Sequence, residues 1–588
     1  MFWDRILDAI CEAGISVVAT FFCWEFHEIE RGRFDLTGET APERDVDAFM
    51  RACVARELKV FARPGPIIDS EWPSRGPSAD LATLERTDPR FRDRATGWTR
   101  AISAKLAEHQ QPHGPVAYVQ IDNEIFYPHF TEVSATEADS AIQIPFDPDR
   151  ILADLRAWRE QPGELAPELL QALPGFPDDP APRFAELPLA HRLLAFEFTN
   201  SVVDGYLRWV HQEMRASGIA VPITTNVKQS CAYLDAARFD ATVEEVGFNY
   251  YLEHLETPEQ LQVGHWWAGL ARTELRRPWA PEFWCGRWME EDADTRVFKE
   301  DHYRYIVLCT LALGFRQLNL FMAVDRDDWH YAAFTGLGKP RAAARALTSL
   351  RAVFDAIEPD ERLADVGLLW TRPHHQAFVA ERFRDWKEPS GIWVEQAEPK
   401  ESAAWWSSLA AIVDGDQDLT LLSSEAEVLA APCVIYAGPS WAEQWVAPAL
   451  ARRLEEGRPV LFSGEVPLDD LAGERRGDAG NLAELAQQAI HTTPEQLPSA
   501  LERAGIFPWV STGGELVSTA YRRRDGSVWL FLVNRRAAPV RCPLTMRPEL
   551  RAATRRQLAG PDPFLDDDTV ALPGRTVALV ELVPARGA

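Results

Sequence analysis

The stretch Val116-Ala-Tyr-Val-Gln-Ile-Asp-Asn-Glu124 decides the fold, because its apolar strand runs directly into three polar residues. Such a run is typical of a parallel strand that is buried on both faces and turns polar only at its carboxyl end. In barrels of alternating strands and helices, catalytic side chains stand at the carboxyl ends of the strands. The stretch therefore predicts a barrel strand over 116–122 and a functional edge just beyond it.

Six further segments in the first 350 residues share this pattern, and helical segments separate them. Together the predicted strands cover 16–24, 58–63, 116–122, 221–225, 245–250, 277–283 and 317–324. Seven strands in near-strict alternation with helices indicate an α/β fold, a (β/α)8 TIM barrel with one strand unaccounted for. The missing strand should be the first, because the chain opens in a helical pattern over 3–13. That strand either forms irregularly or lies upstream of a late start.

The pattern changes twice along the chain, which predicts three domains. Residues 1–355 form a catalytic barrel with an insertion over 127–190, whose Pro-rich middle excludes regular structure. The insertion follows a strand, so it is either a pocket wall or a surface elaboration. Residues 361–500 resemble a flavodoxin-like α/β domain, without a G-x-G-x-x-G or P-loop to bind a nucleotide. Residues 505–588 form a small antiparallel β domain.

The composition narrows the possible partners. The 588 residues include 61 Lys and Arg against 89 Asp and Glu, which gives a net charge of −28. A polyanion repels phosphate backbones and acidic lipid, so neither nucleic acid nor a membrane is an expected partner. The longest apolar run, over 305–315, is too short for a span of about 20 residues. The eight Cys form no C-x-x-C pair, and unpaired thiols without a visible signal peptide favour the cytoplasm.

Two carboxylates stand at predicted strand ends that are far apart in the sequence. Glu124 follows the fourth strand and Glu282 ends the seventh, if the missing strand is counted as the first. Two carboxyl groups facing each other across a pocket are what glycosidic cleavage requires. One protonates the leaving oxygen, while the other attacks the anomeric carbon or activates water. Either Glu alone could be a strand-end ion pair, but the pair indicates a glycosidase.

These residues lie in motifs that resemble a known family. The segments 17–28 (VVATFFCWEFHE), 63–72 (RPGPIIDSEW), 120–124 (QIDNE) and 281–284 (PEFW) resemble the family 35 glycoside hydrolases, chiefly β-galactosidases. The order of barrel, α/β domain and β domain looks more like the family 42 β-galactosidases, which are often trimers through the middle domain. Both families belong to a clan of retaining enzymes with the acid/base on strand four and the nucleophile on strand seven. The resemblance implies a retaining exo-β-glycosidase that acts on an oligosaccharide or glycoside, without a cofactor.

Carried over to this chain, the resemblance assigns roles to individual residues. Glu124 matches the acid/base, Glu282 the nucleophile, and Asn123 the residue that binds the sugar 2-OH. Asp69, Ser70 and Glu71 fall where the family binds sugar hydroxyls. Trp24, Glu25, Tyr250, Trp284 and Trp329 lie at or near strand ends, where they are expected to line the sugar pocket. No metal site is predicted, because His27 and His330 lack a ligand pattern such as H-E-x-x-H.

The chain departs from the family in the subsite of the cleaved sugar. Family 35 has Tyr-Val-Pro-Trp-Asn where this chain has Phe21-Phe-Cys-Trp-Glu25, and Gly-Pro-Tyr-Ile where it has Gly65-Pro-Ile-Ile68. The first choice for the glycone is a β-galactoside. A β-glucosaminide, a β-glucoside and an α-L-arabinopyranoside stay open, as does a non-catalytic sugar-binding protein on a degenerate barrel. A homo-oligomer, with a trimer as the first guess, is expected from the middle domain.

Overall fold

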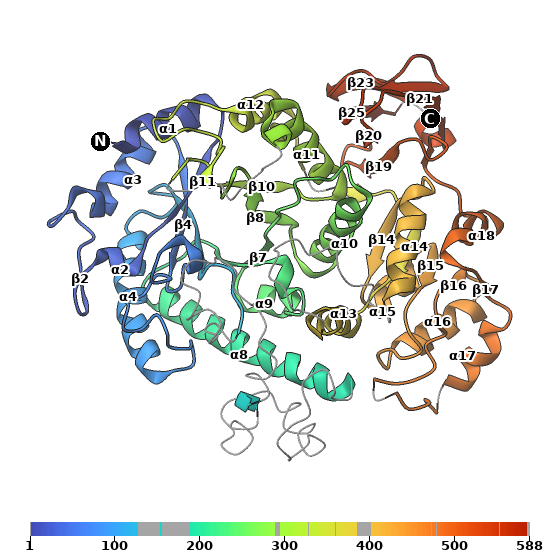
Figure 1. The fold of residues 1–588 in the computed structure, drawn as a ribbon, viewed down its shortest axis with the longest axis horizontal. Helices are drawn as coiled ribbons and strands as arrows, with labels where there is room; N and C mark the ends of the chain where they lie inside the picture. Colours follow the sequence, from blue (N-terminus) through green and yellow to red (C-terminus); the bar gives the residue numbers. More distant parts are fainter. Residues whose placement is uncertain are drawn as a thin grey trace.

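The fold is described from a computed structural model, which contains three five-stranded sheets (Figure 1). The barrel elements occupy the left and centre of Figure 1, a parallel sheet lies to the right, and an antiparallel sheet at the upper right. The structure describes residues 2–127, 153–155, 189–288, 295–326, 329–358, 360–384, 402–471, 473–477, 479–551 and 553–584. Most of the predicted insertion over 127–190 lies outside these residues.

Seven parallel strands build the barrel, one for each predicted strand. They are β1 (Val17–Phe21), β4 (Lys59–Gly65), β5 (Val116–Ile121), β6 (Ile223–Val227), β7 (Glu245–Phe248), β8 (Trp279–Trp284) and β10 (Gln317–Phe321). The first five form one sheet in chain order, and β8 pairs with β10. A parallel bridge between Tyr250 and Phe283 joins the two groups. The prediction of an α/β fold is thereby confirmed.

Helices on the outside alternate with these strands. They are α1 (Phe2–Glu12), α3 (Val46–Val54), α4 (Pro89–Ala107), α8 (Leu189–Ala216), α9 (Ala236–Thr242), α10 (Pro258–Glu274), α11 (Glu300–Leu313) and α12 (Ala342–Asp355). Several begin at a side chain that caps the first turn: Asp45 accepts from the Ala48 amide, and Thr257 from that of Gln260. Shorter elements lie between them: α2 (Trp24–His27), β2 (Glu28–Glu30), β3 (Arg33–Phe34), β9 (Arg287–Trp288), β11 (Trp329–His330), and the 3-10 helices η1 (Pro42–Arg44), η2 (Asp69–Glu71), η5 (Gln229–Cys231) and η6 (Thr295–Phe298).

The barrel is open between its first and last strands. Among the described residues, no strand pairs with the outer edge of β1 or of β10. The helices on either side of this seam nevertheless meet, as Figure 1 shows for α1 and α12, and the Thr348 hydroxyl donates to the Ala13 carbonyl at 3.2 Å. Residues of β1 are partly exposed along the seam, and Val17 is 36% exposed. Among the described residues, β1 is thus an edge strand of the barrel sheet.

The second sheet is parallel throughout. Its strands β13 (Val366–Leu369), β14 (Leu419–Leu422), β15 (Cys433–Tyr436), β16 (Val460–Phe462) and β17 (Ile490–His491) lie in the order β14-β13-β15-β16-β17. This order is that of a flavodoxin-like doubly wound sheet. Its helices are α13 (Arg372–Arg384), α14 (Ala403–Asp414), α15 (Glu425–Ala430), α16 (Val446–Glu455), α17 (Ala479–Ala486) and α18 (Leu497–Arg503), with η7 (Pro494–Gln496) before α18. Helix α10 of the barrel packs against β14 and α14.

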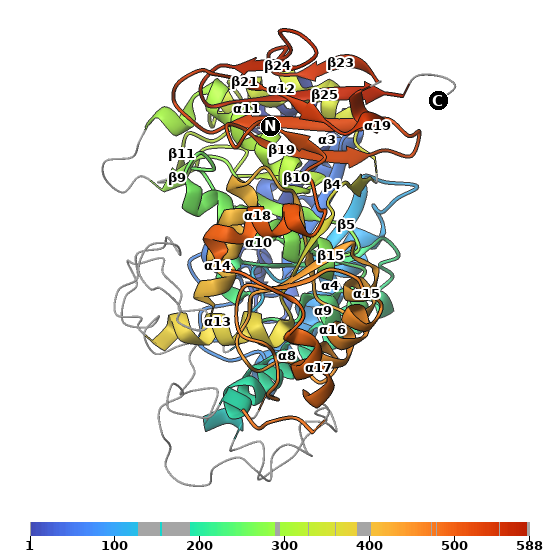
Figure 2. The same cartoon turned by 90° about the vertical axis from the view of Figure 1, so that its right-hand side faces the viewer.

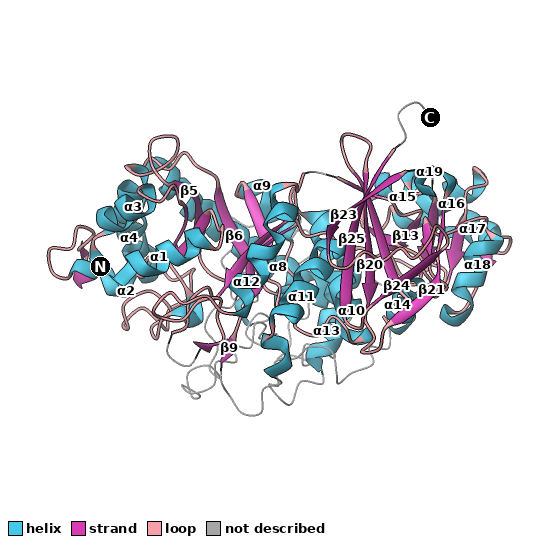
Figure 3. Ribbon diagram, turned by 90° about the horizontal axis from the view of Figure 1, so that it is seen from above, coloured by secondary structure: helices cyan, strands magenta, loops and turns pink. Residues whose placement is uncertain are grey.

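The third sheet is antiparallel and has the order β12-β19-β20-β25-β23. Its strands are β12 (Glu361–Arg362), β19 (Val517–Arg522), β20 (Val528–Asn534), β25 (Thr576–Val583) and β23 (Thr554–Ala559); β18 (Val510–Ser511), β21 (Val540–Pro543), β22 (Thr545–Met546), α19 (Pro548–Arg551) and β24 (Thr569–Leu572) flank it. Figure 2 shows this sheet above the other two, and Figure 3 shows its strands beside α11, which β25 contacts. Because β12 pairs with β19, residues 361–362 join this sheet and not the flavodoxin-like one predicted to start there.

Candidate active site

Glu124 and Glu282 face each other across the carboxyl ends of the barrel strands. Glu124 follows β5, and Glu282 lies near the end of β8. One side-chain nitrogen, Nδ2 of Asn249, donates to Glu124 Oε1 and to Glu282 Oε2, each at 2.9 Å. The two carboxylate oxygens are therefore no farther apart than twice that distance. The structure thus brings together two carboxylates that lie 158 positions apart in the sequence.

Glu282 is surrounded by hydrogen-bond donors. Its Oε1 atom accepts from the Arg63 guanidinium and, at 3.4 Å, from Asn226, while Oε2 accepts from Asn249 and from the Tyr251 hydroxyl at 2.7 Å. Burial raises the pKa of Glu282, and the charge of Arg63 opposes that rise. A carboxyl group whose partners all donate is best satisfied in its ionised form, which accepts at both oxygens. The arrangement suits a carboxylate nucleophile.

Glu124 has a different environment. Its Oε2 atom lies 3.0 Å from the ammonium nitrogen of Lys228, which follows β6. Its backbone has a positive φ of 51°, and its amide donates to Asn226 Oδ1 at 2.8 Å. Because a non-glycine residue adopts this φ only at a cost, the Asn226 contact helps to fix the turn that presents the carboxylate.

A buried ion pair between Arg86 and Asp122 supports the turn that carries Glu124. Asp122 accepts from Arg86 Nε at 2.8 Å, from the Tyr206 hydroxyl at 2.9 Å and from the Ile67 amide at 3.0 Å. Burial raises the pKa of Asp122, and the charge of Arg86 opposes this. Arg86 also donates to the carbonyl of Phe126, beyond Glu124, at 2.8 Å. The pair therefore ties both sides of the turn to one fixed cation.

Asn123 lies beside Glu282, and its side-chain oxygen accepts two hydrogen bonds. Oδ1 of Asn123 accepts from Arg63 at 2.5 Å and from Asn226 at 3.0 Å. Arginine has donors only, so the amide oxygen must face it and the amide nitrogen must point elsewhere. Asn123 thus retains a donor that its oxygen contacts do not use.

The predicted hydroxyl-binding residues after β4 are also near the two glutamates. Asp69 and Glu71 lie buried in η2, and the charge of Glu124 acts on Glu71. Burial raises the pKa of Glu71 to about 8, although its carboxylate pairs with Arg326 at 2.9 Å. Ser70 lies in the same turn, and its side chain is outside the described atoms. Glu25 accepts from Trp72 Nε1 at 2.7 Å and from the Ser74 hydroxyl at 2.6 Å, so it anchors the residues that follow η2.

Most of the aromatic residues predicted to line the sugar pocket are packed in the hydrophobic core. Trp24 is fully buried and stacks on Trp98, with ring centroids 6.5 Å apart. Tyr250 is fully buried between Phe283 and Phe315. We therefore correct the expectation for both residues. Trp24 begins the short helix α2 and packs against α4, and the alternation of side chains turns Tyr250 away from the site that Tyr251 faces. Trp284 is buried as well and stacks on the ring of Tyr303.

Trp329 lies nearer to the site, although it is buried too. Its ring meets Phe321 edge to face at 5.6 Å, and Phe321 meets Tyr251 at 6.3 Å. Sequence reasoning left out five polar residues that contact the glutamates or Asn123: Arg63, Asn226, Lys228, Asn249 and Tyr251. Each stands at or just past the carboxyl end of a predicted strand, which is the signal that could have found them.

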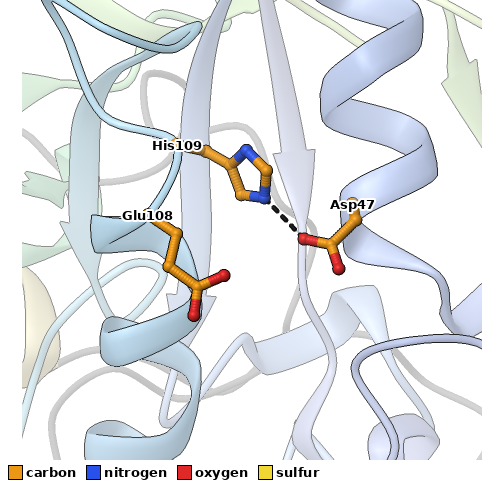
Figure 4. A group of neighbouring side chains, drawn as sticks. All are labelled: Asp47, Glu108 and His109. Atoms are coloured by element: carbon orange, nitrogen blue, oxygen red, sulfur yellow. Dashed lines mark hydrogen bonds and ion pairs between the residues drawn. The ribbon is translucent and has the colours of Figure 1, made fainter.

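A group of possible metal ligands occurs away from this site. Asp47, Glu108 and His109 lie close together between α3 and the end of α4 (Figure 4). His109 Nε2 is 2.6 Å from Asp47 Oδ1, and the Lys105 ammonium lies 3.2 Å from Asp47 and 2.9 Å from Glu108. The lysine already supplies the positive charge that these carboxylates attract.

Comparisons with known proteins support the predicted resemblance. The model of the glycosyl hydrolases family 35 matches residues 1–144. An exo-β-D-glucosaminidase of Thermococcus kodakarensis is 25% identical over 252 residues, which are 38% of this chain and 30% of that protein. The β-galactosidase of Bos taurus is 30% identical over 129 residues, 21% of this chain and 19% of that enzyme. The aligned part thus spans less than a third of either relative.

Solved structures match over almost the whole chain. A β-galactosidase from Bacillus circulans sp. alkalophilus has a TM-score of 0.72 at 12% identity, covering 99% of this chain and 97% of that one. Gan42B, a GH42 β-galactosidase, has a TM-score of 0.66 at 12% identity, covering 98% and 95%. The chain therefore shares the fold of these β-galactosidases. The resemblance to family 35 in the barrel motifs and to family 42 in the architecture is confirmed.

Proposed function

We propose that this protein is a retaining exo-β-glycosidase, with Glu282 as the nucleophile and Glu124 as the acid/base. The observation that carries the proposal is the single Asn249 nitrogen that donates to both carboxylates. It keeps their facing oxygens within twice 2.9 Å of each other. This limit lies below the 6.5–9.5 Å or so between the carboxyl groups of inverting enzymes, and the spacing of about 5–5.5 Å in retaining enzymes falls within it.

In the first step, Glu282 Oε attacks the anomeric carbon while Glu124 protonates the leaving oxygen, so the glycosidic bond breaks as the glycosyl-enzyme ester forms. In the second step, Glu124 removes a proton from water, which attacks the same carbon and releases Glu282. Arg63, Asn249 and Tyr251 hold the carboxylate in position for attack. Their bonds loosen and re-form as the negative charge leaves and returns.

The donors beside Glu282 favour a glycone with a hydroxyl at C2. In a retaining site, that carbon lies next to the nucleophile, where Arg63 places a positive charge and Asn123 retains an amide donor. A hydroxyl oxygen accepts from such groups, whereas the ammonium of a glucosaminide has donors only and is repelled by Arg63. We therefore propose a β-galactoside as the preferred substrate. We expect a β-glucosaminide to be a poorer substrate than glycosides that carry a hydroxyl at C2.

A panel of 4-nitrophenyl glycosides tests this proposal. We expect release of nitrophenol from the β-galactoside or another 2-hydroxy glycoside, and at least about tenfold less from the β-glucosaminide. Glu282→Ala serves as the blank and Glu502→Ala, at an exposed position of α18, as the matched control. Proton NMR of the first product should show retention of the β anomer. Inversion would contradict the mechanism, and turnover by Glu282→Ala would contradict the assignment of the nucleophile.

We further propose that three domains act together as in family 42, with the middle domain forming a homo-oligomer. Light scattering on the purified protein would test for a trimer against a monomer.

All eight Cys are free thiols, seven of them buried, which supports a proposed location in the reducing cytoplasm. In the part of the chain that the structure describes, no helix has both the length and the apolar character needed to cross a membrane.

A further inference from the structure

Lys228 is the cation that contacts the acid/base carboxylate. Its ammonium nitrogen lies 3.0 Å from Glu124 Oε2 and 4.7 Å from the centroid of the Phe126 ring. The side chains of Lys228 and Glu124 are each 16% exposed, so little water screens the pair. None of the four motif segments contains this lysine, and it follows a different strand (β6) from either glutamate.

Several other ionisable side chains lie around Glu124 and Lys228. Glu282, Glu71 and Tyr251 interact with Glu124, and Asp69 and Cys231 interact with Lys228. The nearby cations Arg63 and Arg326 act on Glu282 and Glu71. Two of the cations are engaged elsewhere, because Arg63 contacts Glu282 and Arg326 pairs with Glu71. Within the described residues, Lys228 is the cation whose ion pair is with Glu124.

The lysine behaves as a fixed charge. Burial disfavours its charged form, but the carboxylates of Glu124 and Asp69 outweigh burial and raise the pKa of Lys228 above its ordinary value. The ammonium group therefore stays protonated wherever a glycosidase works. It cannot exchange a proton with the substrate, and its effect must pass through Glu124.

We propose that Lys228 is a positioning residue: it fixes Oε2 of Glu124 and balances the negative charge of Glu282 and Asp69, so that Glu124 can both give up and regain its proton in one cycle. This inference rests on the proposed function. Without the lysine, the Glu124 carboxyl would face the Glu282 carboxylate and one neutral donor, Asn249. It would then keep its proton to higher pH and serve poorly as the base of the second step.

The test compares the pH profile of kcat/KM in Lys228→Met, Lys228→Gln and Lys228→Arg. Methionine keeps the apolar stem against Phe126 without the charge, glutamine keeps a donor, and arginine keeps both charge and donor. We expect the basic limb to move up by about one pH unit or more in the Met and Gln variants, and to stay in place in the Arg variant. Lys339→Met, at an exposed position, is the matched control.

A second measurement does not depend on turnover. Infrared difference titration of the parent against Glu124→Gln isolates the carboxyl signal of Glu124, and it is repeated in Lys228→Met and Lys228→Gln. The midpoint should rise in both variants relative to the parent. An unchanged midpoint in folded protein would overturn the inference even if the glycoside panel is positive. A raised midpoint with a silent panel would leave the inference standing and count against the proposed function alone.

Discussion

The Tyr251 hydroxyl donates a hydrogen bond of 2.7 Å to Oε2 of Glu282. Burial and the negative charge of Glu282 raise the pKa of Tyr251 well above its ordinary value, so the phenol remains a donor. The preceding residue, Tyr250, points the opposite way and is packed in the core. Of these two adjacent tyrosines, Tyr251 thus donates to the Glu282 carboxylate and Tyr250 packs in the core.

Replacing Tyr251 by Phe should lower kcat without a comparable change in KM. A hydrogen bond to a charged group contributes about 1.5–3 kcal/mol, and this one must re-form on Glu282 as the ester intermediate is cleaved. The expected loss is therefore about 10- to 100-fold in kcat. Steady-state kinetics on the best aryl glycoside of the panel measures it.

Tyr250→Phe is the matched control for that substitution. The Tyr250 ring is fully buried and packs on Phe283 and Phe315, so kcat should stay within about twofold of the parent. If the two variants lost activity equally, the tyrosines would be acting through stability, and the role assigned to Tyr251 would be wrong.

Much of the barrel could be predicted from the sequence because its strands are short apolar runs bounded by polar residues. The segment 116–122 and the observed strand β5 (Val116–Ile121) agree to within one residue. The positions of Glu124 and Glu282 followed from the same rule, since strand ends in such folds converge on one face.

The contacts within the site could not be predicted in the same way. Lys228, Asn226 and Asn249 are ordinary polar residues in the sequence, and only the side-by-side order of β5, β6 and β7 brings them to Glu124. The expectation for Tyr250 failed for a related reason. A strand-end Trp or Tyr points either inward or outward, and one step along the chain reverses its direction.

Gly247→Ala should damage the barrel beside the nucleophile. Gly247 lies in β7, and a β-carbon there would overlap the ring of Pro281 and lie 2.7 Å from the ring of Trp279. Overpacking of this kind costs about 1–3 kcal/mol, and moving Pro281 displaces the adjacent Glu282. We expect a lower midpoint in urea and a lower kcat/KM together.

Gly97→Ala provides the control for that glycine. It lies in α4, and a β-carbon there would meet nothing within 4 Å. Alanine is the better helix former by up to about 1 kcal/mol, so this variant should be as stable as the parent or more so. Equal destabilisation by both changes would refute the steric explanation for Gly247.

Arg86→Met should destabilise the fold strongly. Arg86 and Asp122 are each 1% exposed, and removal of the cation leaves a buried carboxylate with one charge partner fewer. The expected loss is about 3–5 kcal/mol in the free energy of unfolding, measured by urea denaturation. Adding Asp122→Asn to Arg86→Met should recover part of it, because the uncompensated charge is gone. The exposed pair of Arg90 and Asp88 is the contrast, and Arg90→Met should cost at most about 1 kcal/mol.

Acid should weaken the junction between α10 and the flavodoxin-like sheet. Nδ1 of His375 accepts from the indole nitrogens of Trp266 and Trp370, at 3.1 and 2.7 Å, so this nitrogen cannot carry a proton while both contacts persist. Burial lowers the pKa of His375 well below its ordinary value and that of the adjacent His374 to about 4. The unfolded chain binds protons at both residues below about pH 6.5, whereas the folded chain does not. Their contribution to stability is therefore complete above about pH 6.5 and is lost as the pH falls.

Between pH 7 and pH 5, this linkage should remove about 2 kcal/mol of unfolding free energy for each of the two histidines. Urea denaturation at pH 7 and pH 5 measures the difference. In His375→Gln, the amide oxygen can still accept from both indoles but does not titrate, so the loss over this range should shrink by about half. His109→Gln, at a partly exposed surface ion pair, should leave the loss almost unchanged. If His375→Gln lost as much stability as the parent, the acid sensitivity would have to come from groups other than this indole-bound imidazole.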